Sequence, residues 1–149
     1  MRRFLIYTSI ERFREVPHIH GKILTGALLI SNGVRKDVDV VFYLVDIRKA
    51  VKISGARVRR LYPDEESSIG FLKKAFSNPI EARDLTVGVT MGAGGRVLCF
   101  PKPPFTYLVK LVEGIYLDVE CGAGVDRLPP HHQVVVVNIM ADRIAAGRQ

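Results

Sequence analysis

Residues 35–46, with the sequence RKDVDVVFYLVD, decide the fold of this chain. The run Asp37–Val45 is rich in β-branched and aromatic residues, and Arg35-Lys36 and Asp46 bound it with charge. A short, nearly continuous apolar run of this composition is typical of a strand that is buried on both faces of a sheet. We therefore predict a buried strand at this point of the chain.

Strand and helix patterns alternate on either side of this run. Before it, Arg3–Tyr7 predicts a short strand, and Lys22–Ser31 predicts a helix that Asn32-Gly33 closes. Glu11–Gly21 is expected to be irregular because Pro17 interrupts it. After it, Lys52–Leu61 fits a short strand or an extended loop.

A second helix is predicted to begin after Asp64, whose side chain suits an N-cap. Acidic residues fill its first turn, and Ile69, Leu72 and Phe76 share one apolar face. Lys73-Lys74 lie near its carboxyl end, where positive charge suits the helix dipole.

The second half continues with predicted strands and one short helix. The strands are expected at Thr86–Thr90, Arg96–Phe100 and Ile115–Val119, and the helix at Phe105–Glu113. The stretch from His131 stays open, because Val134–Val137 has strand propensity whereas its length and Ala-rich tail suit a helix. The alternation predicts one α/β domain, with strands expected to be parallel.

Length and composition exclude several classes of protein. The 149 residues are 48% hydrophobic and 25% charged, a profile that excludes a disordered chain. The apolar runs fall far short of the roughly 20 residues that span a bilayer, and the first apolar segment is shorter than a secretory signal. We expect a cytoplasmic protein without membrane contact. Cys99 and Cys121 form no CxxC pair, which excludes a disulfide framework or a zinc ribbon.

The positive charge is concentrated in one half of the chain. The net charge is +7, and residues 1–62 hold 13 Lys and Arg against 5 Asp and Glu, whereas residues 63–149 hold 9 against 10. Such asymmetry predicts a basic face that attracts a polyanion such as RNA. A basic surface that only keeps the protein in solution accounts for the charge equally well.

Short motifs give weak indications of chemistry. His18-Ile19-His20 would place two imidazoles on one side of a strand, but no third metal ligand is nearby. His131-His132 precede the last element, and adjacent residues on a helix point about 100° apart, so both cannot readily serve one metal. We therefore expect no metal. Gly92-Ala93-Gly94-Gly95 does not complete a dinucleotide-binding motif. Gly122-Ala123-Gly124 follows a predicted strand, where glycines let a ligand approach the backbone.

The densest group of charges is more informative. Basic residues at 35–36, 52 and 57–60 are interleaved with Asp37 and Asp64-Glu65. Guanidinium groups suit phosphate, and a carboxylate beside them stays ionised and could take a proton. From spacing alone, a salt-bridged surface is the favoured interpretation.

This same region resembles a known family. The stretches are VRKDV at 34–38 with VFY at 41–43, VKISG at 51–55, VRRLYPDE at 58–65 and IGFLKKA at 69–75. They resemble the archaeal tRNA pseudouridine-54 N1-methyltransferases, enzymes of the SPOUT class that have an α/β knot and use S-adenosylmethionine. The opening MRRFL is also similar, and the second half matches by its order of elements.

The resemblance implies a shortened and divergent member of that family. Its fold would be a SPOUT-like α/β knot with a mostly parallel sheet flanked by helices, in one domain over 1–149. Residues 1–86 would form a basic, RNA-facing half and 87–149 a knotted, cofactor-binding half. The last element would then be a helix in the interface of a homodimer.

The resemblance also implies a cofactor site and a substrate site. The knot, about residues 97–134, would hold S-adenosylmethionine through Phe100, Pro101, Cys121, Gly122, Gly124, Leu128 and His132. The partner would be tRNA, with Asp37 or Asp64 taking the proton from the pseudouridine nitrogen. Its phosphates or a flipped base would be held by Arg35, Arg57, Arg59 and Arg60.

Three departures from the family pattern support an alternative. Pro101-Lys102-Pro103-Pro104 stands where the family has Gly-Asp-His, Met91-Gly92 replaces an arginine, and no acidic residue follows Gly21-Lys22. The alternative is a non-catalytic RNA-binding protein that keeps the SPOUT fold. A third hypothesis is a dimeric structural or interaction protein that binds no RNA.

Overall fold

The computed structural model describes residues 2–30, 33–59, 61–81, 96–98, 105–110, 118–120 and 128–146. Its helices are α1 (Ile10–Glu15), α2 (Pro17–Leu28), α3 (Glu65–Phe76) and α4 (Pro130–Ala145). Its strands are β1 (Arg2–Thr8), β2 (Leu29–Ile30), β3 (Gly33–Val34), β4 (Val38–Leu44), β5 (Lys49–Ser54), β6 (Ile80–Glu81), β7 (Arg96–Leu98), β8 (Phe105–Lys110) and β9 (Asp118–Glu120). Within the described part of the chain, no helix is both long and apolar enough to cross a bilayer.

A five-stranded mixed sheet organises the chain, in the order β6-β5-β4-β1-β8. The three strands β4, β1 and β8 are parallel, whereas β5 and β6 run antiparallel to their neighbours. Separately, β7 and β9 pair in parallel, and β2 and β3 form a two-residue antiparallel pair. The prediction of an α/β fold is confirmed, and the strands are parallel at the centre of the main sheet.

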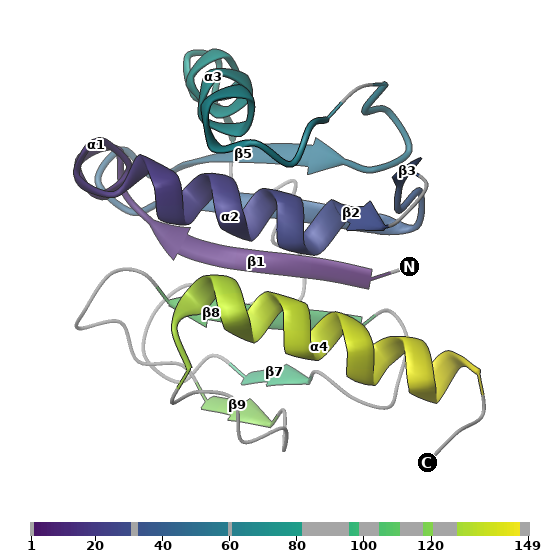
Figure 1. The fold of residues 1–149 in the computed structure, drawn as a ribbon. Helices are drawn as coiled ribbons and strands as arrows, with labels where there is room; N and C mark the ends of the chain where they lie inside the picture. Colours follow the sequence, from purple (N-terminus) through teal and green to yellow (C-terminus); the bar gives the residue numbers. More distant parts are fainter. Residues whose placement is uncertain are drawn as a thin grey trace.

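The helices α3, α2 and α4 lie in a row on one face of this sheet (Figure 1). Here β1 and β4 present Phe4, Ile6 and Phe42, all of which are buried. The ring of Phe42 lies 5.3 Å from that of Phe76 in α3 and 5.9 Å from that of His20 in α2. This face is therefore the main hydrophobic core.

The opposite face of the sheet is also buried. Leu5, Tyr7 and Val41 alternate with the core residues and are at most 1% exposed. The rings of Tyr7 and Tyr43 meet edge to face with their centres 5.4 Å apart. Burial raises the pKa of Tyr7 to about 12, and the neighbouring Tyr43 adds to the shift. Burial on both faces explains why the strand sequences are apolar almost throughout.

The predicted strands at Arg3–Tyr7 and Asp37–Val45 are confirmed as β1 and β4. The predicted helix after Asp64 is confirmed as α3, and the stretch from His131 belongs to α4. In α4 the alternation of buried Val134 and Val137 with exposed Val135 follows the helical period. Tertiary burial of one helix face has therefore outweighed the strand propensity of its valines.

Two predictions of secondary structure are wrong. Glu11–Gly21 is helical rather than irregular, since Pro17 stands at the first turn of α2, where its missing N–H costs nothing. The helix expected at Lys22–Ser31 therefore begins at Pro17 and ends at Leu28, and the next residues enter β2. The helix expected at Phe105–Glu113 begins as strand β8, whose position beside β1 satisfies its backbone in the sheet.

The remaining predictions are met in part or lie outside the described residues. Of the strands expected at Arg96–Phe100 and Ile115–Val119, the described portions are Arg96–Leu98 in β7 and Asp118–Glu120 in β9. The strand within Lys52–Leu61 starts earlier, at Lys49. The strand expected at Thr86–Thr90, Gly92–Gly95, and Cys99 lie outside the described residues.

A buried polar cluster fixes α4 to the start of β1. Arg2 donates from Nη1 to Oδ1 of Asn138 and from Nη2 to Oδ1 of Asp142, the latter at 3.0 Å. Asn138 in turn donates to the carbonyl oxygens of Gly26 and Ala27 in α2. Burial favours a raised pKa for Asp142, but hydrogen bonds from Arg35 and Arg2 outweigh it and hold that pKa below its usual value. One cluster therefore joins β1, α2 and α4.

His20 is a neutral part of the core. Its two ring nitrogens lie 2.7 Å from Oγ1 of Thr8 and 2.9 Å from the carbonyl oxygen of Val16. Phe13 and Phe42 pack against the ring. The carbonyl can only accept, so Nδ1 carries the proton and Nε2 accepts from the Thr8 hydroxyl. Burial lowers the pKa of His20 to about 4.

We predict that the free energy of unfolding decreases as the pH falls below 6.5. Unfolded His20 takes up a proton near pH 6.5, whereas the folded imidazole stays neutral down to about pH 4, so acid favours the unfolded state. This contribution is complete above pH 6.5, falls by about 2 kcal/mol at pH 5 and by about 3 kcal/mol below pH 4. Urea unfolding at pH 7.5, 6 and 5 measures the loss.

The matched variant is His20→Leu, which has no imidazole to titrate. The variant is less stable at pH 7.5, but its stability should change less than that of the wild type between pH 7.5 and 5. Equal pH dependence in the two proteins would contradict the neutral state of His20.

Candidate functional site

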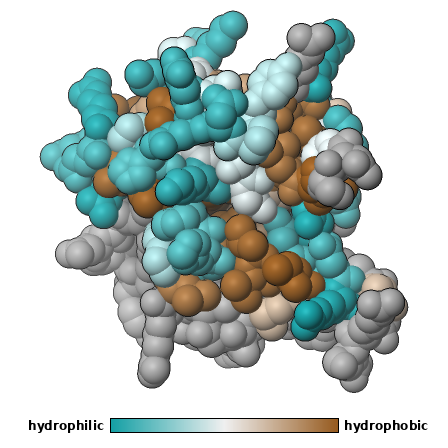
Figure 2. Space-filling model, in the orientation of Figure 1, coloured by the Kyte–Doolittle hydropathy of each residue, from teal (hydrophilic) through white to brown (hydrophobic). Residues whose placement is uncertain are grey.

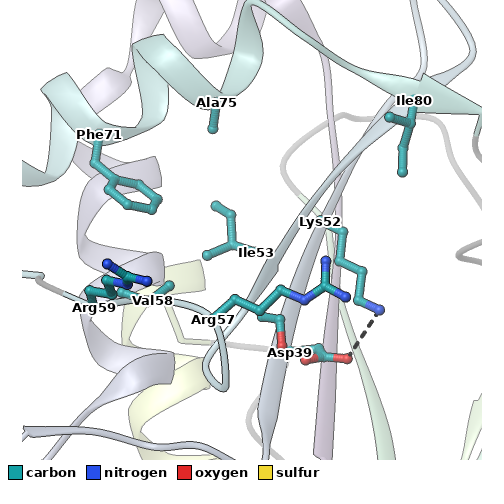
Figure 3. A pocket seen from close by; sticks show the side chains of 10 residues that line it. Asp39, Lys52, Ile53, Arg57, Val58, Arg59, Phe71, Ala75 and Ile80 are labelled. Carbon is teal, nitrogen blue, oxygen red and sulfur yellow. Dashed lines mark ion pairs between the residues drawn. The ribbon is translucent and has the colours of Figure 1, made fainter.

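The open edge of β5 carries a pocket of about 740 Å³. Strands β4 and β5, the segment after β5, helix α3 and Ile80 supply its walls (Figure 3). Its lining residues are Asp39, Lys52, Ile53, Ser54, Arg57, Val58, Arg59, Phe71, Ala75 and Ile80. A pocket of this size is in the range that holds a small ligand.

Strand pairing leaves this edge open. The partner strand β6 pairs only with Lys49 and Ala50, at the beginning of β5. The register places Lys52 and Ser54 on the same face as Asp39, whereas Ile53 faces the helices. The pocket therefore extends around the edge of the sheet. Lys52, Ser54 and Asp39 line it on one face of the sheet, and Ile53 lines it on the face that the helices cover.

Gly55 allows the chain to turn back beside the pocket. Its N–H donates to the carbonyl oxygen of Val38 at 2.8 Å. A Cβ atom at this position would lie 2.8 Å from that same oxygen and would collide with the carbonyl of Arg35. Only glycine fits this approach without moving the backbone, so residues 57–59 follow directly along the pocket wall.

One end of the pocket is charged. The carboxylate of Asp39 is 3% exposed, and its Oδ2 lies 3.7 Å from Nζ of Lys52 and 3.9 Å from Nη2 of Arg3. That oxygen has no hydrogen-bond partner among the described residues. The side chain of Arg57 extends toward Lys52 and Asp39 (Figure 3). Among the described lining residues at this end, Lys52 and Arg57 outnumber the one carboxylate, so this end attracts anions.

The other end of the pocket is apolar. Phe71 and Ala75 of α3 lie across from Ile53, and Val58 and Arg59 also line the pocket (Figure 3). Phe71 is partly exposed, so its ring is accessible from the pocket. An aromatic ring beside an arginine is a surface on which a planar base can stack.

The structure brings only some of the predicted substrate residues together. Arg57 and Arg59 line the pocket and are exposed. Arg35 is not among the lining residues, because its guanidinium pairs with Asp142 of α4 at 2.9 Å and is 18% exposed. Arg60 lies outside the described residues.

The two predicted catalytic carboxylates occupy different settings. Asp37 is exposed in the turn before β4. Asp64 is the N-cap of α3, and its carboxylate accepts the N–H of Ser67 at 2.9 Å. This backbone hydrogen bond lowers the pKa of Asp64. Neither carboxylate lines the pocket; Asp39 does.

Most of the predicted cofactor residues lie outside the described part of the chain: Phe100, Pro101, Cys121, Gly122 and Gly124. Of the others, Leu128 is exposed, and its carbonyl oxygen accepts from Nε2 of Gln133. His132 is exposed in the first turn of α4, with its ring 4.2 Å from that of His131. Burial lowers the pKa of His131, and the neighbouring His132 lowers it further.

The two short strands β7 and β9 are the described elements nearest in sequence to the five of these residues that lie outside the described part of the chain. β7 ends at Leu98 and β9 ends at Glu120, and the two strands are parallel neighbours. The carboxyl ends of these two strands therefore lie at the same edge of the pair. Ligands of open α/β sheets bind outside the carboxyl ends of such strands.

His18 and His20 do not form the pair that the sequence suggested. They lie in helix α2 rather than a strand, so residues two apart point in different directions. His20 is buried against Thr8 and Val16. Among the described residues, no three His, Cys, Asp or Glu side chains gather as a metal site would need.

Asp39 is the residue that sequence reasoning missed. A signal was present, since an acidic residue interrupts the apolar run Val38–Leu44. A carboxylate in a strand buried on both faces must be paired with cations or serve a site. The register of β5, which brings Lys52 beside it, could not be read from the sequence.

Comparisons with known proteins agree with the motifs described above. The chain is 36% identical over 111 residues to the tRNA (pseudouridine(54)-N(1))-methyltransferase of Halobacterium salinarum, across 72% of this chain and 54% of that protein. It is 44% identical over 57 residues to the enzyme of the same name from Methanopyrus kandleri, across 36% of this chain and 28% of that protein. The chain thus matches about half or less of these relatives' lengths. No family model matches the chain.

Both of these relatives are named as RNA-modifying methyltransferases. Within that class, the chain belongs to the family of archaeal tRNA (pseudouridine(54)-N1)-methyltransferases. The resemblance inferred from residues 34–75 is confirmed.

We predict that Asp64→Ala lowers the melting temperature by about 2–4 °C, because the first turn of α3 loses its cap. Asp64→Ser should restore most of the loss, since a serine hydroxyl also accepts from the backbone at an N-cap. Thermal unfolding followed by circular dichroism measures both. If the alanine variant melts with the wild type, the cap does not stabilise α3.

Proposed function

We propose that the protein is an S-adenosylmethionine-dependent RNA methyltransferase that methylates N1 of a pseudouridine in tRNA. The observation that carries this proposal is the similarity to the Halobacterium enzyme over 111 residues, since it extends over most of this chain. The basic pocket at the edge of β5 supports an RNA substrate independently.

The cofactor half of the proposal concerns residues 87–149. We propose that this half forms the SPOUT knot over about 97–134, and that residues 1–86 face the RNA. S-adenosylmethionine carries the methyl group on a sulfonium sulfur. The thioether that departs is already an activated leaving group, so the transfer requires no metal. The segments after β7 and β9, with Phe100, Pro101, Cys121, Gly122 and Gly124, would hold it, together with Leu128 and His132. The parallel pairing of β7 and β9 supports this placement.

For the substrate, the proposal assigns a base that takes the pseudouridine proton and arginines that contact the RNA. The pseudouridine N1–H must lose its proton as the methyl group arrives, and an exposed carboxylate serves as the base. Asp37 and Asp64 are exposed and are our candidates. Arg57 and Arg59 would contact the RNA directly, with Arg60 next to them in the sequence.

A second candidate function follows from the sequence at Pro101-Lys102-Pro103-Pro104. The family has Gly-Asp-His at this point, so the cofactor loop differs in a residue that carries charge. A non-catalytic RNA-binding protein with the same fold would keep the basic pocket and lack affinity for S-adenosylmethionine.

We also propose that α4 mediates a homodimer. Val135 and Ile139, one helical turn apart, are 42% and 47% exposed. Figure 2 shows hydrophobic residues gathered on the surface where α4 lies. An apolar strip on a helix that is otherwise packed on the sheet suits a symmetric contact with a second copy.

Calorimetric titration with S-adenosylmethionine and S-adenosylhomocysteine tests the enzymatic proposal first. We expect saturable binding in the micromolar range at about one site per chain. Methyl transfer should then occur to tRNA that carries pseudouridine at position 54 and not to the same transcript with uridine. Asp64→Ser, which keeps the cap, tests the carboxylate in this assay.

Absence of heat and of a thermal shift at millimolar cofactor would reject the enzymatic proposal. If such a protein still bound tRNA in a salt-dependent manner, the non-catalytic function would be established. If it bound no tRNA either, only the structural role would remain.

We predict that the double variant Val135→Lys and Ile139→Lys sediments as a monomer under conditions in which the wild type is a dimer. Two charges on facing copies of α4 cannot be desolvated without a large cost. Ile47→Lys is the control, because Ile47 is 43% exposed and lies in the turn between β4 and β5. A dimeric double variant, or a monomeric wild type, would exclude α4 as the interface.

A further inference from the structure

We infer that the pocket at the open edge of β5 binds one unstacked ribonucleotide of the RNA substrate. Its base stacks on Phe71, its phosphate lies at Arg57, and its ribose 2′-hydroxyl donates to Oδ2 of Asp39. This inference rests on the proposed function for the identity of the RNA, but it concerns a second site. Of the residues proposed to hold the cofactor, the two that the structure describes, Leu128 and His132, do not line this pocket.

The apolar end of the pocket fits a base. Phe71 presents its ring from α3, and Ile53 of β5 stands across from it with Ala75 nearby (Figure 3). Arg59 lines the same pocket, and its guanidinium offers a second planar surface. Stacking of one base on such an aromatic ring typically contributes tenfold or more to affinity.

The charged end fits a phosphate. Among the described residues, Lys52 and Arg57 line this end beside the carboxylate of Asp39, and Arg3 lies 3.9 Å from the same carboxylate. Two of the described lining residues here, Lys52 and Arg57, are cations, and Arg57 is exposed, so an anion can approach without displacing a buried group. A guanidinium offers the paired donors that phosphate oxygens accept.

Asp39 determines which sugar can lie between the base and the phosphate. Its Oδ2 is buried, has no hydrogen-bond partner among the described residues, and stands farther than hydrogen-bond distance from Lys52 and Arg3. A carboxylate only accepts, so its complement is a donor. A phosphodiester has no donor, whereas a ribose has its 2′-hydroxyl. The site should therefore favour RNA over DNA.

The shape of the pocket suits a nucleotide within a chain as well as a free one. The volume of about 740 Å³ accommodates a base, a sugar and a phosphate. Because Arg57 and Arg59 are exposed, the pocket opens to solvent, and neighbouring nucleotides can continue along the surface.

Binding of four probes to the full chain tests this inference. The probes are the hexanucleotides rA6 and dA6 and the mononucleotides AMP and 2′-deoxy-AMP, each titrated by calorimetry without cofactor. We expect rA6 to bind at least fivefold more tightly than dA6 and at least tenfold more tightly than AMP. Equal affinity for rA6 and dA6 would overturn the role of Asp39, and equal affinity for AMP and rA6 would overturn the assignment to an RNA chain.

Variants locate the binding site. Phe71→Leu keeps an apolar side chain in α3 and should weaken rA6 binding about tenfold. Arg57→Gln should weaken it about threefold to tenfold, whereas the control Arg48→Gln, an exposed arginine outside the pocket, should leave it unchanged. Asp39→Leu should bring the ratio of rA6 to dA6 affinity close to one. Unchanged rA6 affinity in folded Phe71→Leu and Arg57→Gln would overturn the inference.

Failure of this inference and failure of the proposed function are distinguishable. If tRNA is methylated and rA6 does not bind, the methyltransferase stands and the nucleotide pocket is rejected. If rA6 binds as expected but S-adenosylmethionine does not, the pocket stands and the enzymatic proposal is rejected. For Asp39→Leu, heteronuclear NMR adds a second measurement. Chemical-shift changes on addition of rA6 that are confined to β5 and α3 would show that the variant is folded and binds at the same pocket.

Discussion

The rest of the structure depends on the parallel pairing of β1 with strands on both of its sides. β4 follows it soon in the sequence, and β8 comes from the second half of the chain. β1 therefore joins the basic half to the half proposed to hold the cofactor. Arg2, at the start of this strand, extends the junction to α4 through Asn138 and Asp142. A change in the register of β1 would displace all of these contacts together.

The same register builds the pocket at the open edge of β5. Pairing of β1 with β4 sets Arg3 opposite Asp39, and pairing of β4 with β5 sets Asp39 opposite Ser54. Two residues along, Lys52 completes the charged end. The apolar end depends on α3, whose start is fixed by Asp64 and whose face is fixed by Leu72 and Phe76. The pocket is thus assembled from strand register and one capped helix.

Local patterns predicted the elements whose causes are local. The apolar run of β4, the acid-to-base gradient of α3 and its N-cap are all visible in the sequence. The pattern failed at Pro17, where the same proline that interrupts one helix begins the next. It failed again at β8, where only the presence of β1 beside Phe105–Lys110 decides between strand and helix.

The candidate site could be predicted only in part for a similar reason. Arg57 and Arg59 were recognised from their density of charge, and they do line the pocket. Arg35, equally basic and only two residues before Asp37, turns instead to Asp142 in α4, a partner that no local rule identifies. The burial of Asp39 and its pairing with Arg3 and Lys52 depend on the register of two strand pairs, which the sequence does not reveal.

The position of β1 also governs how the chain is made. During synthesis β4 emerges soon after β1, but β8 emerges only much later, so one side of β1 waits without a neighbour. Its free N–H and C=O groups and its apolar side chains form a template that any extended segment can join. Parallel pairs between distant segments form slowly because the intervening loop must close first. Until β8 arrives, this edge of β1 is the part of the sheet most exposed to wrong pairing, and the interval before its arrival is the period of greatest exposure.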